Sequence, residues 1–250
     1  MWTLERAPEP PVWFPATPIA GSRLCFTTRR GGVSVPPYDS LNLGRSSGDD
    51  LDAVEGNRRW ILERIGLAPD ALATVGQVHG GEVQRVDAPG HTPGCDALVT
   101  RTPVLALAVS AADCLPILYA APGAVAAAHA GWRGLLAGIA EATLRELSDV
   151  AIVSPLRITA HLGPCIRSCC FQVGPEVARR FPAAFVTTRD GASYVDLPGV
   201  ARRRLLDAGM SEAEIHDTGA CTACEPHWYF SHRRDRGRTG RMWGLAARIH

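Results

Sequence analysis

Short apolar runs separated by turn residues dominate the first half of the chain. Continuous apolar runs occupy residues 97–100, 104–112, 116–120 and 124–130, and Gly, Pro or Asp lies between them. Runs of this length and continuity are typical of strands that are buried on both faces of a sheet. Residues 23–28 predict a further strand, and residues 72–80 and 82–87 predict two strands joined as a hairpin by Gly80 and Gly81.

Helical spacing of apolar residues appears later, with three further strands between and after the helices. The predicted helices cover residues 49–66, 131–147, 175–185 and 197–210, and the strands cover residues 157–163, 214–221 and 242–249. Residues 8–18 are rich in proline and are predicted to be a lead-in without regular structure. Strands outnumber helices in the first half, so a simple βαβ alternation fails. We expect an α+β fold of mixed, layered β-sheets with outer helices.

Composition narrows the class of protein. The chain has 250 residues, which favours a single domain over residues 1–250. Its net charge of +1 gives no electrostatic reason to expect a nucleic-acid partner. We expect no membrane association and a cytoplasmic location, because neither a signal peptide nor a long apolar segment is evident. All 26 basic residues are arginine, which excludes chemistry that needs a lysine side chain.

Three potential metal ligands occupy similar positions next to predicted strands. His79 lies in "QVHGGEV", Cys114 in "AADCLP" and His129 in "AAHAGWRG", each beside an apolar run and a turn. Two histidines and one cysteine form a plausible zinc site that leaves a fourth position for water or substrate. The spacing is not a short local signature, so the alternative of a buried cysteine and two core histidines stays open.

A second interpretation makes Cys114 a nucleophile and one of the histidines its base. Asp113 beside it would not help, because a neighbouring negative charge raises the pKa of a thiol. Asp113 has two other possible roles, as a general acid/base or as a carboxylate that orients His79 or His129.

The other cysteines give a weaker signal. Cys221 and Cys224 have C-x-x-C spacing, and Cys165, Cys169 and Cys170 could supply partners, although with irregular spacing. We therefore predict that Cys221 and Cys224 are packing residues and do not form a second metal site. Residues 57–59 and 231–241 are rich in arginine, which suits bidentate binding of phosphate or carboxylate.

Together these motifs resemble one known family. "GGVSVPPYDSLNLG", "GDDLDAVEGNRR", "QVHGGEV", "ADCLPIL", "HAGWRG", "GPCIRSCCFQVG" and "CTAC…YFSHRRDRGRTGR" occur in this order between residues 31 and 241. The chain resembles the laccase-domain, or YfiH-like, family, which carries both a multicopper polyphenol oxidase label and a purine nucleoside phosphorylase label. The resemblance implies a fold similar to the catalytic domain of cytotoxic necrotising factor, which uses a Cys–His pair.

The resemblance also implies a function and a site. His79, Cys114 and His129 would bind zinc and be catalytic, while Asn42 and Arg58 would bind substrate. The implied reactions are phosphorolysis of adenosine, inosine and methylthioadenosine, with phosphate as co-substrate, and deamination of adenosine. A copper-dependent polyphenol oxidase is the alternative, although eight histidines without repeated His-x-His pairs suit four coppers poorly. A metal-bearing binding or quality-control protein that does not act on nucleosides is the third hypothesis.

Overall fold

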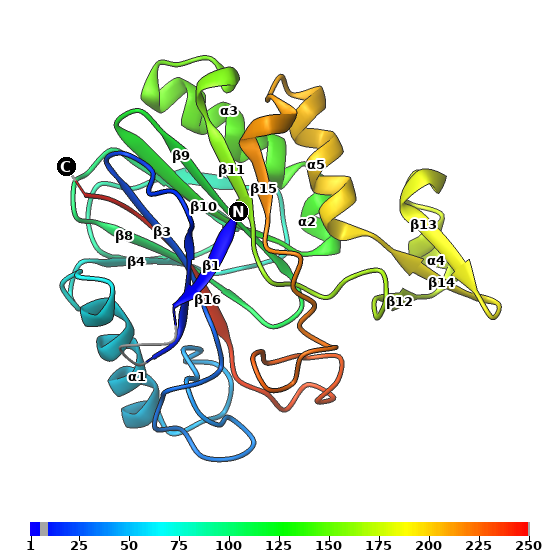
Figure 1. The fold of residues 1–250 in the computed structure, drawn as a ribbon, viewed down its shortest axis with the longest axis horizontal. Helices are drawn as coiled ribbons and strands as arrows, with labels where there is room; N and C mark the ends of the chain where they lie inside the picture. The colour runs from blue at the N-terminus through cyan, green and yellow to red at the C-terminus, as the bar shows by residue number, and fades with distance from the viewer. Residues whose placement is uncertain (6–9, 250) are drawn as a thin grey trace.

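Two large mixed β-sheets form the centre of the computed structural model, which describes residues 1–5 and 10–249 (Figure 1). The first sheet contains β1 (Trp2–Glu5), β2 (Val12–Pro15), β3 (Ser22–Thr27), β4 (Leu72–Val75), β6 (Gly90–Thr92), β8 (Ala106–Ala111) and β16 (Met242–Arg248). The second contains β5 (Val83–Arg85), β7 (Ala97–Thr100), β9 (Leu115–Ala121), β10 (Ala124–Ala130), β11 (Thr159–Leu162) and β15 (Ile215–Asp217). Their strand orders are β1-β2-β3-β16-β8-β4-β6 and β15-β11-β9-β10-β7-β5.

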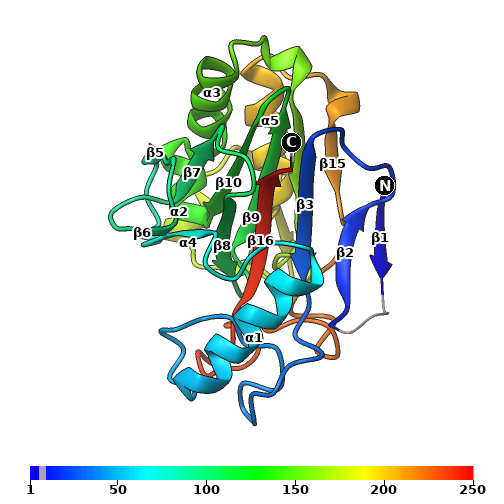
Figure 2. The ribbon, with the colours of Figure 1, turned by 90° about the vertical axis from the view of Figure 1, so that its left-hand side faces the viewer.

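The two sheets pack face to face, and helices cover their outer faces (Figure 2). The helices are α1 (Leu51–Arg64), α2 (Trp132–Ala137), α3 (Ile139–Ala151), α4 (Pro175–Ala178) and α5 (Leu197–Asp207). Helix α1 packs on the seven-stranded sheet, whereas α2, α3 and α5 pack on the six-stranded sheet. The predicted α+β class, with mixed sheets and outer helices, is therefore confirmed. Within the described parts of the chain, no helix is long and apolar enough to cross a membrane.

Strand β10 shows why the apolar runs are continuous. Val125 and Ala127 face the core between the two sheets, whereas Ala126 and Ala128 face the core beneath the helices. Successive side chains of a strand point to opposite faces. A central strand with a core on each side therefore has no polar face, and the sequence reads as one apolar run.

The predicted helix over residues 131–147 is two helices. Gly138 adopts a left-handed conformation with φ of 91°, ends α2 and begins α3. Glycine reaches this region without the steric cost that a side chain would impose. Both helices contact β10, and α3 also contacts β5, β7 and β9.

The predicted helix over residues 175–185 is wrong for most of its length. Only Pro175–Ala178 is α-helical, and Ala183–Phe185 forms a 3₁₀ turn. Pro182 separates them, and proline cannot donate the backbone hydrogen bond that a continuing helix needs. The segment instead leads into a three-stranded sheet of β12 (Gln172–Val173), β13 (Val186–Arg189) and β14 (Ala192–Val195), which extends from the body of the molecule (Figure 1).

The hairpin predicted at Gly80 and Gly81 is also wrong. Strand β4 belongs to the seven-stranded sheet and β5 to the six-stranded sheet, so residues 76–82 cross from one sheet to the other. The crossing segment carries His79. In the lead-in predicted over residues 8–18, β2 forms a strand that pairs with β1; residues 8 and 9 lie outside the described residues.

Candidate metal centre

Strand register brings two of the three predicted donors together. In β10, Val125 and Ala127 face the core between the sheets, so His129, two residues further on, faces the same side. Cys114 immediately precedes β9 and shares the side of Leu118, which also faces that core. Because β9 and β10 run antiparallel, the start of one and the end of the other lie side by side.

A buried carboxylate brings in the third donor. Asp96 is fully buried, and its Oδ1 accepts hydrogen bonds from the backbone N of His79 at 2.9 Å and pairs with Nδ1 of His129 at 2.8 Å. Its Oδ2 accepts from the backbone N of Gly80 at 2.8 Å. His79 has a φ of 62°, so this crossing segment takes an uncommon conformation that Asp96 holds in place.

The three donors converge closely enough to bind one ion. One ligand atom from each of His79, Cys114 and His129 lies within 4.8 Å of the others, and Sγ of Cys114 is 3.9 Å from Nε2 of His79. Asp96 occupies Nδ1 of His129, which leaves Nε2 for a metal, as is usual for histidine ligands held by a carboxylate. The predicted convergence of these residues is therefore present.

The electrostatics of the cluster favour a thiolate. Burial alone would raise the pKa of Cys114, but the charge of His129 and hydrogen bonds from both histidines lower it. Burial alone would likewise lower the pKa of His129, but the charge of Cys114 and the hydrogen bond to Asp96 raise it. The pKa of Asp96 itself is lowered, because hydrogen bonds from His129 and the backbone of Gly80 outweigh its burial. A thiolate is both the metal-binding and the nucleophilic form of cysteine.

Gly131 in the "HAGWRG" motif leaves room for the cluster. A Cβ atom at this position would lie 3.0 Å from Cδ2 of His79 and 3.1 Å from Sγ of Cys114. Both contacts are tighter than a carbon atom normally makes. Any side chain at residue 131 would therefore push two of the donors outward.

The donors lie in a large, positively charged cavity. The cavity has a volume of about 880 Å³, within the roughly 300–1,000 Å³ range of small-molecule sites. Its charged lining side chains are five arginines and one aspartate: Arg45, Arg58, Arg133, Arg233, Arg241 and Asp113. An anionic ligand would therefore be favoured beside the donors.

Arg58 lies in the wall of this cavity, as predicted. Its side chain is buried, with its guanidinium 4.7 Å from the centre of the Trp243 ring. Burial and the charge of Arg45 lower the pKa of Arg58 to about 10, so it stays charged at neutral pH. Arg45 holds Glu55 in a bidentate contact at 2.6 and 2.9 Å, whereas Arg58 lies 3.4 Å from the same carboxylate. Two guanidinium groups thus share one carboxylate, and the three side chains together carry a net positive charge that favours an anionic ligand.

Asn42 is buried behind the cavity wall. The next two residues, Leu43 and Gly44, form part of that wall. Its amide nitrogen donates to Ser47 Oγ at 2.7 Å, and its amide oxygen accepts from the backbone N of Gly44 at 3.1 Å and of Arg241 at 2.8 Å. We expect Asn42 to position this loop and Arg241, an arginine of the cavity, and to act on substrate through them.

Replacing Asn42 with alanine would leave the backbone N–H groups of Gly44 and Arg241 without their acceptor. The expected loss is about 2–4 kcal/mol in the free energy of unfolding, with metal content retained. Urea unfolding measures it, and Ser46→Ala in the same exposed loop serves as the control. An unchanged stability together with lost substrate affinity would instead indicate direct contact between Asn42 and substrate.

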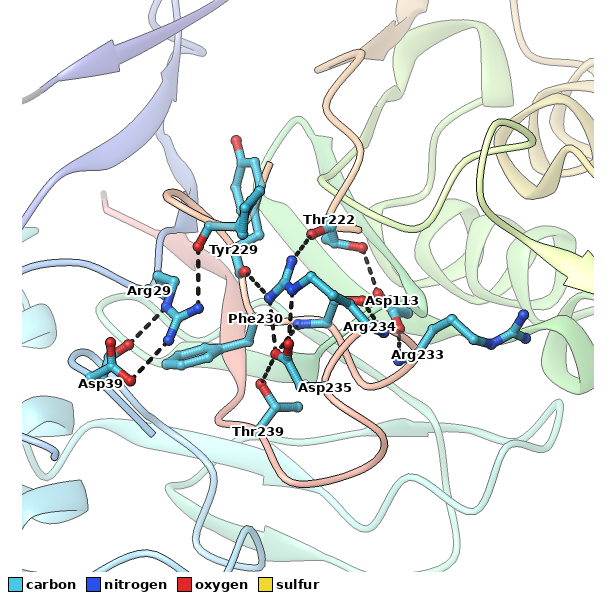
Figure 3. A network of polar contacts seen from close by, with 12 residues as sticks. Arg29, Asp39, Asp113, Thr222, Tyr229, Phe230, Arg233, Arg234, Asp235 and Thr239 are labelled. Atoms are coloured by element: carbon cyan, nitrogen blue, oxygen red, sulfur yellow. Dashed lines mark hydrogen bonds and ion pairs between the residues drawn. The ribbon is translucent and has the colours of Figure 1, made fainter. Parts of the chain in front are cut away.

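Asp113 does not orient either histidine, and that role belongs to Asp96. One carboxylate oxygen of Asp113 accepts from Oγ1 of Thr222 at 2.7 Å, and the other accepts from the backbone N of Arg233 at 2.6 Å (Figure 3). Asp113 also has a φ of 94°, and its backbone O accepts from the N of Ile166 at 2.9 Å. Asp113, the residue that precedes Cys114, is therefore tied to loops that are distant in the sequence.

The five cysteines between residues 165 and 224 fall into two groups. Cys165 is buried in the core, whereas Cys169, Cys170, Cys221 and Cys224 form a compact group with all Sγ atoms within 4.8 Å of one another. Cys169 and Cys170 thus supply the partner pair for Cys221 and Cys224 that the irregular spacing did not clearly indicate.

Sequence reasoning missed two positioning residues. Asp96 precedes the apolar run 97–100, much as Cys114 lies just before the run 116–120, so its place before a buried strand was the available signal. Gln77 joins the crossing segment to β8, because its side chain exchanges two hydrogen bonds with the backbone of Ser110, at 2.7 and 2.9 Å. No local pattern distinguishes Gln77 from an exposed loop residue.

Comparison with known proteins places the chain among well-defined relatives. The model of the family described as multi-copper polyphenol oxidoreductase laccase matches residues 23–249. A protein of Deinococcus radiodurans named purine nucleoside phosphorylase is 42% identical over 88% of this chain and 87% of its own. Purine nucleoside phosphorylase YfiH of Escherichia coli is 42% identical over 89% and 92%. The crystal structure of YlmD from Geobacillus stearothermophilus, 36% identical, superposes with a TM-score of 0.89 and covers 94% of each chain.

Proposed function

This chain belongs to the multi-copper polyphenol oxidoreductase laccase family, and from that premise we propose that it is a zinc-dependent purine nucleoside phosphorylase. The proposed substrates are adenosine, inosine and methylthioadenosine, with phosphate, and adenosine deamination is the proposed second reaction. The observation that carries the proposal is the convergence of His79, Cys114 and His129 in a cavity lined by five arginines. The names of the relatives support the class of reaction.

The donor set fits zinc. Two imidazoles and one thiolate are borderline-to-soft ligands, and three protein ligands leave one position open, as catalytic zinc sites require. Asp96 fixes the ring of His129 so that Nε2 is presented. When bound, zinc would supply a Lewis acid that stabilises negative charge on a phosphate oxygen or on water.

The protein's own groups would bind and orient the reactants. In phosphorolysis, a phosphate oxygen attacks C1′ of the ribose while the purine leaves with the C1′–N bond electrons. Arg58 and Arg241 lie in the cavity wall, where charged donors would hold phosphate against that carbon. His129 is buried and Cys114 is half-buried, whereas His79 is exposed, so reactants can reach the donors from solvent.

The direct test is turnover by the purified, zinc-loaded protein. Inosine and phosphate should give hypoxanthine and ribose 1-phosphate, and adenosine without phosphate should give inosine. Chromatography of the bases measures the first reaction, and ammonia release measures the second. A zinc-loaded protein that turns over no nucleoside would refute the proposal and favour a binding or quality-control role.

Replacing Arg58 with alanine should separate the two reactions. Loss of one charged phosphate contact costs about 1.5–3 kcal/mol, which is roughly a tenfold to hundredfold loss of phosphate affinity. Inosine phosphorolysis should therefore need more phosphate, while adenosine deamination, which uses water, is spared and zinc content is unchanged.

The Arg58→Ala measurement is both reactions across a phosphate series, with Arg203→Ala as the matched control. Arg203 is exposed on α5 and pairs with Asp207. Equal loss of both reactions with an unchanged phosphate dependence would show that Arg58 has no phosphate-specific role. Loss of neither reaction would make Arg58 a purely structural residue.

The name of the matching family favours a second candidate, a copper-dependent polyphenol oxidase. Metal analysis of the purified protein, followed by assays with zinc or copper added back, separates the two. Phenol oxidation that depends on copper, with nucleosides left intact, would support the oxidase in place of the phosphorylase.

A further inference from the structure

A second set of metal donors lies outside the cavity, where two loops meet. The first loop, residues 163–171, carries Cys169 and Cys170; the second, residues 218–225, carries Cys221 and Cys224. We propose that these four residues, the tetrathiolate cluster, bind one zinc ion that joins the two loops. The proposal is independent of the reaction at the cavity.

The sulfur positions suit one tetrahedral ion better than a disulfide. Sγ of Cys169 lies 3.4 Å from that of Cys221 and 3.5 Å from that of Cys224, and Sγ of Cys170 lies 3.2 Å from that of Cys224. A tetrahedral zinc with bonds of about 2.3 Å separates its sulfurs by about 3.8 Å, whereas disulfide sulfurs are about 2.05 Å apart. All four residues are free thiols. The three sulfur–sulfur distances thus fall a few tenths of an ångström short of the tetrahedral value.

The ligand type and the available space favour zinc. Four cysteine ligands from two short loops are a closed donor set, which is the signature of a structural zinc site. All four sulfurs lie within 4.8 Å of one another, which leaves room for one ion and none for a cluster of several irons and sulfides. Cys169 and Cys224 are exposed, so an ion has a path from solvent.

Arginine side chains surround such a site. Binding converts four thiols and Zn²⁺ into a complex of charge −2 and releases four protons. Three arginines donate to backbone carbonyls of the two loops: Arg167 to Ala220 (3.2 Å), Arg189 to Cys169 (3.2 Å) and Arg234 to Thr222 (2.7 Å). Arg167 and Arg234 also pair with Asp217 and Asp235, whereas Arg189 lies over the Tyr194 ring, so Arg189 contributes most to the positive charge beside the site.

The same two loops hold the residue before Cys114. From the first loop, the backbone N of Ile166 donates to the backbone O of Asp113 at 2.9 Å. From the second, Oγ1 of Thr222 donates to Oδ1 of Asp113 at 2.7 Å (Figure 3). A zinc ion that joins the loops would therefore fix Asp113 from both sides and help to hold Cys114 at its place in the cavity.

Zinc stoichiometry tests the cluster separately from the cavity. Protein purified with reductant and zinc should contain two zinc ions per chain, and Cys114→Ala should contain one. Adding Cys169→Ser and Cys224→Ser to Cys114→Ala should remove the last ion. Cys95→Ser in the same background is the control, because Cys95 lies outside the cluster, and it should keep that ion.

The ligands of the remaining zinc ion in the Cys114→Ala protein test whether the tetrathiolate cluster binds it. X-ray absorption at the zinc edge should show four sulfurs at about 2.3 Å and no nitrogen ligand. Three results would each overturn the proposal. They are absence of zinc with all four thiols open to alkylation, a disulfide among these cysteines in protein purified with reductant, and bound iron in place of zinc. Failure of nucleoside turnover would not affect these readouts.

Wild-type protein provides a test that needs no substitution. Cys169 and Cys224 are exposed, so they should react at once with an alkylating agent unless a metal protects them. We expect both to resist alkylation until a chelator is added, with sites assigned by peptide mass spectrometry. Hydrogen exchange at Ile166 should then quicken as the loops separate. Immediate alkylation of the zinc-loaded protein, or unchanged exchange after zinc is lost, would contradict the proposed site or its role in joining the loops.

Discussion

Replacing Cys114 with alanine is expected to remove the metal from the cavity and to lower both nucleoside reactions by at least about a hundredfold. The substitution deletes one of three donors and the only sulfur among them. Charge stabilisation by a bound metal contributes several kcal/mol to a reaction, and each 1.36 kcal/mol is a factor of ten in rate. Zinc content by elemental analysis and turnover of inosine and adenosine are the measurements.

Cys25→Ala is the matched control for this prediction. Cys25 is also buried, but it packs between α1 and the seven-stranded sheet, and burial raises the pKa of its thiol to about 12. It is therefore a neutral core residue, and its loss should leave the metal of the cavity in place. If Cys114→Ala kept its zinc at the cavity but lost all activity, Cys114 would be a nucleophile and not a ligand.

Replacing Asp96 with alanine is expected to lower the free energy of unfolding by about 3–5 kcal/mol, which is a large part of the 5–15 kcal/mol typical of a domain. The substitution leaves the backbone N–H groups of His79 and Gly80 without their acceptor and removes the carboxylate from His129. Zinc affinity should also fall by about ten- to hundredfold, because nothing would then fix the imidazole. Unfolding in urea and zinc titration measure the two effects.

The milder Asp96→Asn variant keeps the side-chain volume and separates the two effects. It should retain more stability than Asp96→Ala but still lose zinc affinity, since an amide cannot replace the carboxylate charge beside His129. Asp149→Ala, at an exposed position on α3, is the control and should change stability by less than about 0.5 kcal/mol. Unaltered zinc affinity in both Asp96 variants would show that the histidine needs no such support.

The pattern selected His79, Cys114 and His129 as candidate donors because each of them lies beside an apolar run and a turn, and the family resemblance assigned them as ligands. Cys114 immediately precedes β9 and His129 lies one residue before the end of β10, and the antiparallel pairing of these strands brings the two side chains together. The fold class followed from the same runs. The order of the strands in the two sheets did not follow from the runs. Gly80 and Gly81 predict a hairpin whether or not the flanking strands pair.

What the sequence could not show depends on contacts between distant segments. Asp96 is one acidic residue before a strand, and only the pairing of β7 with β10 brings it to His129. The partners of Cys221 and Cys224 lie more than 50 residues earlier in the chain, and the spacing of Cys165 and Cys169 points to the wrong pair. The fold similarity to cytotoxic necrotising factor and the single-domain organisation stay predictions.

Two of the three cavity donors lie on segments that join one sheet to the other. His79 lies between β4 and β5 and Cys114 between β8 and β9, whereas His129 lies in β10. The three donors therefore converge only after the two sheets have docked and Asp96 has bound the backbone of the crossing segment. We expect metal uptake to follow folding and not to nucleate it. Removal of the metal with a chelator should then yield a folded apoprotein that can bind the metal again.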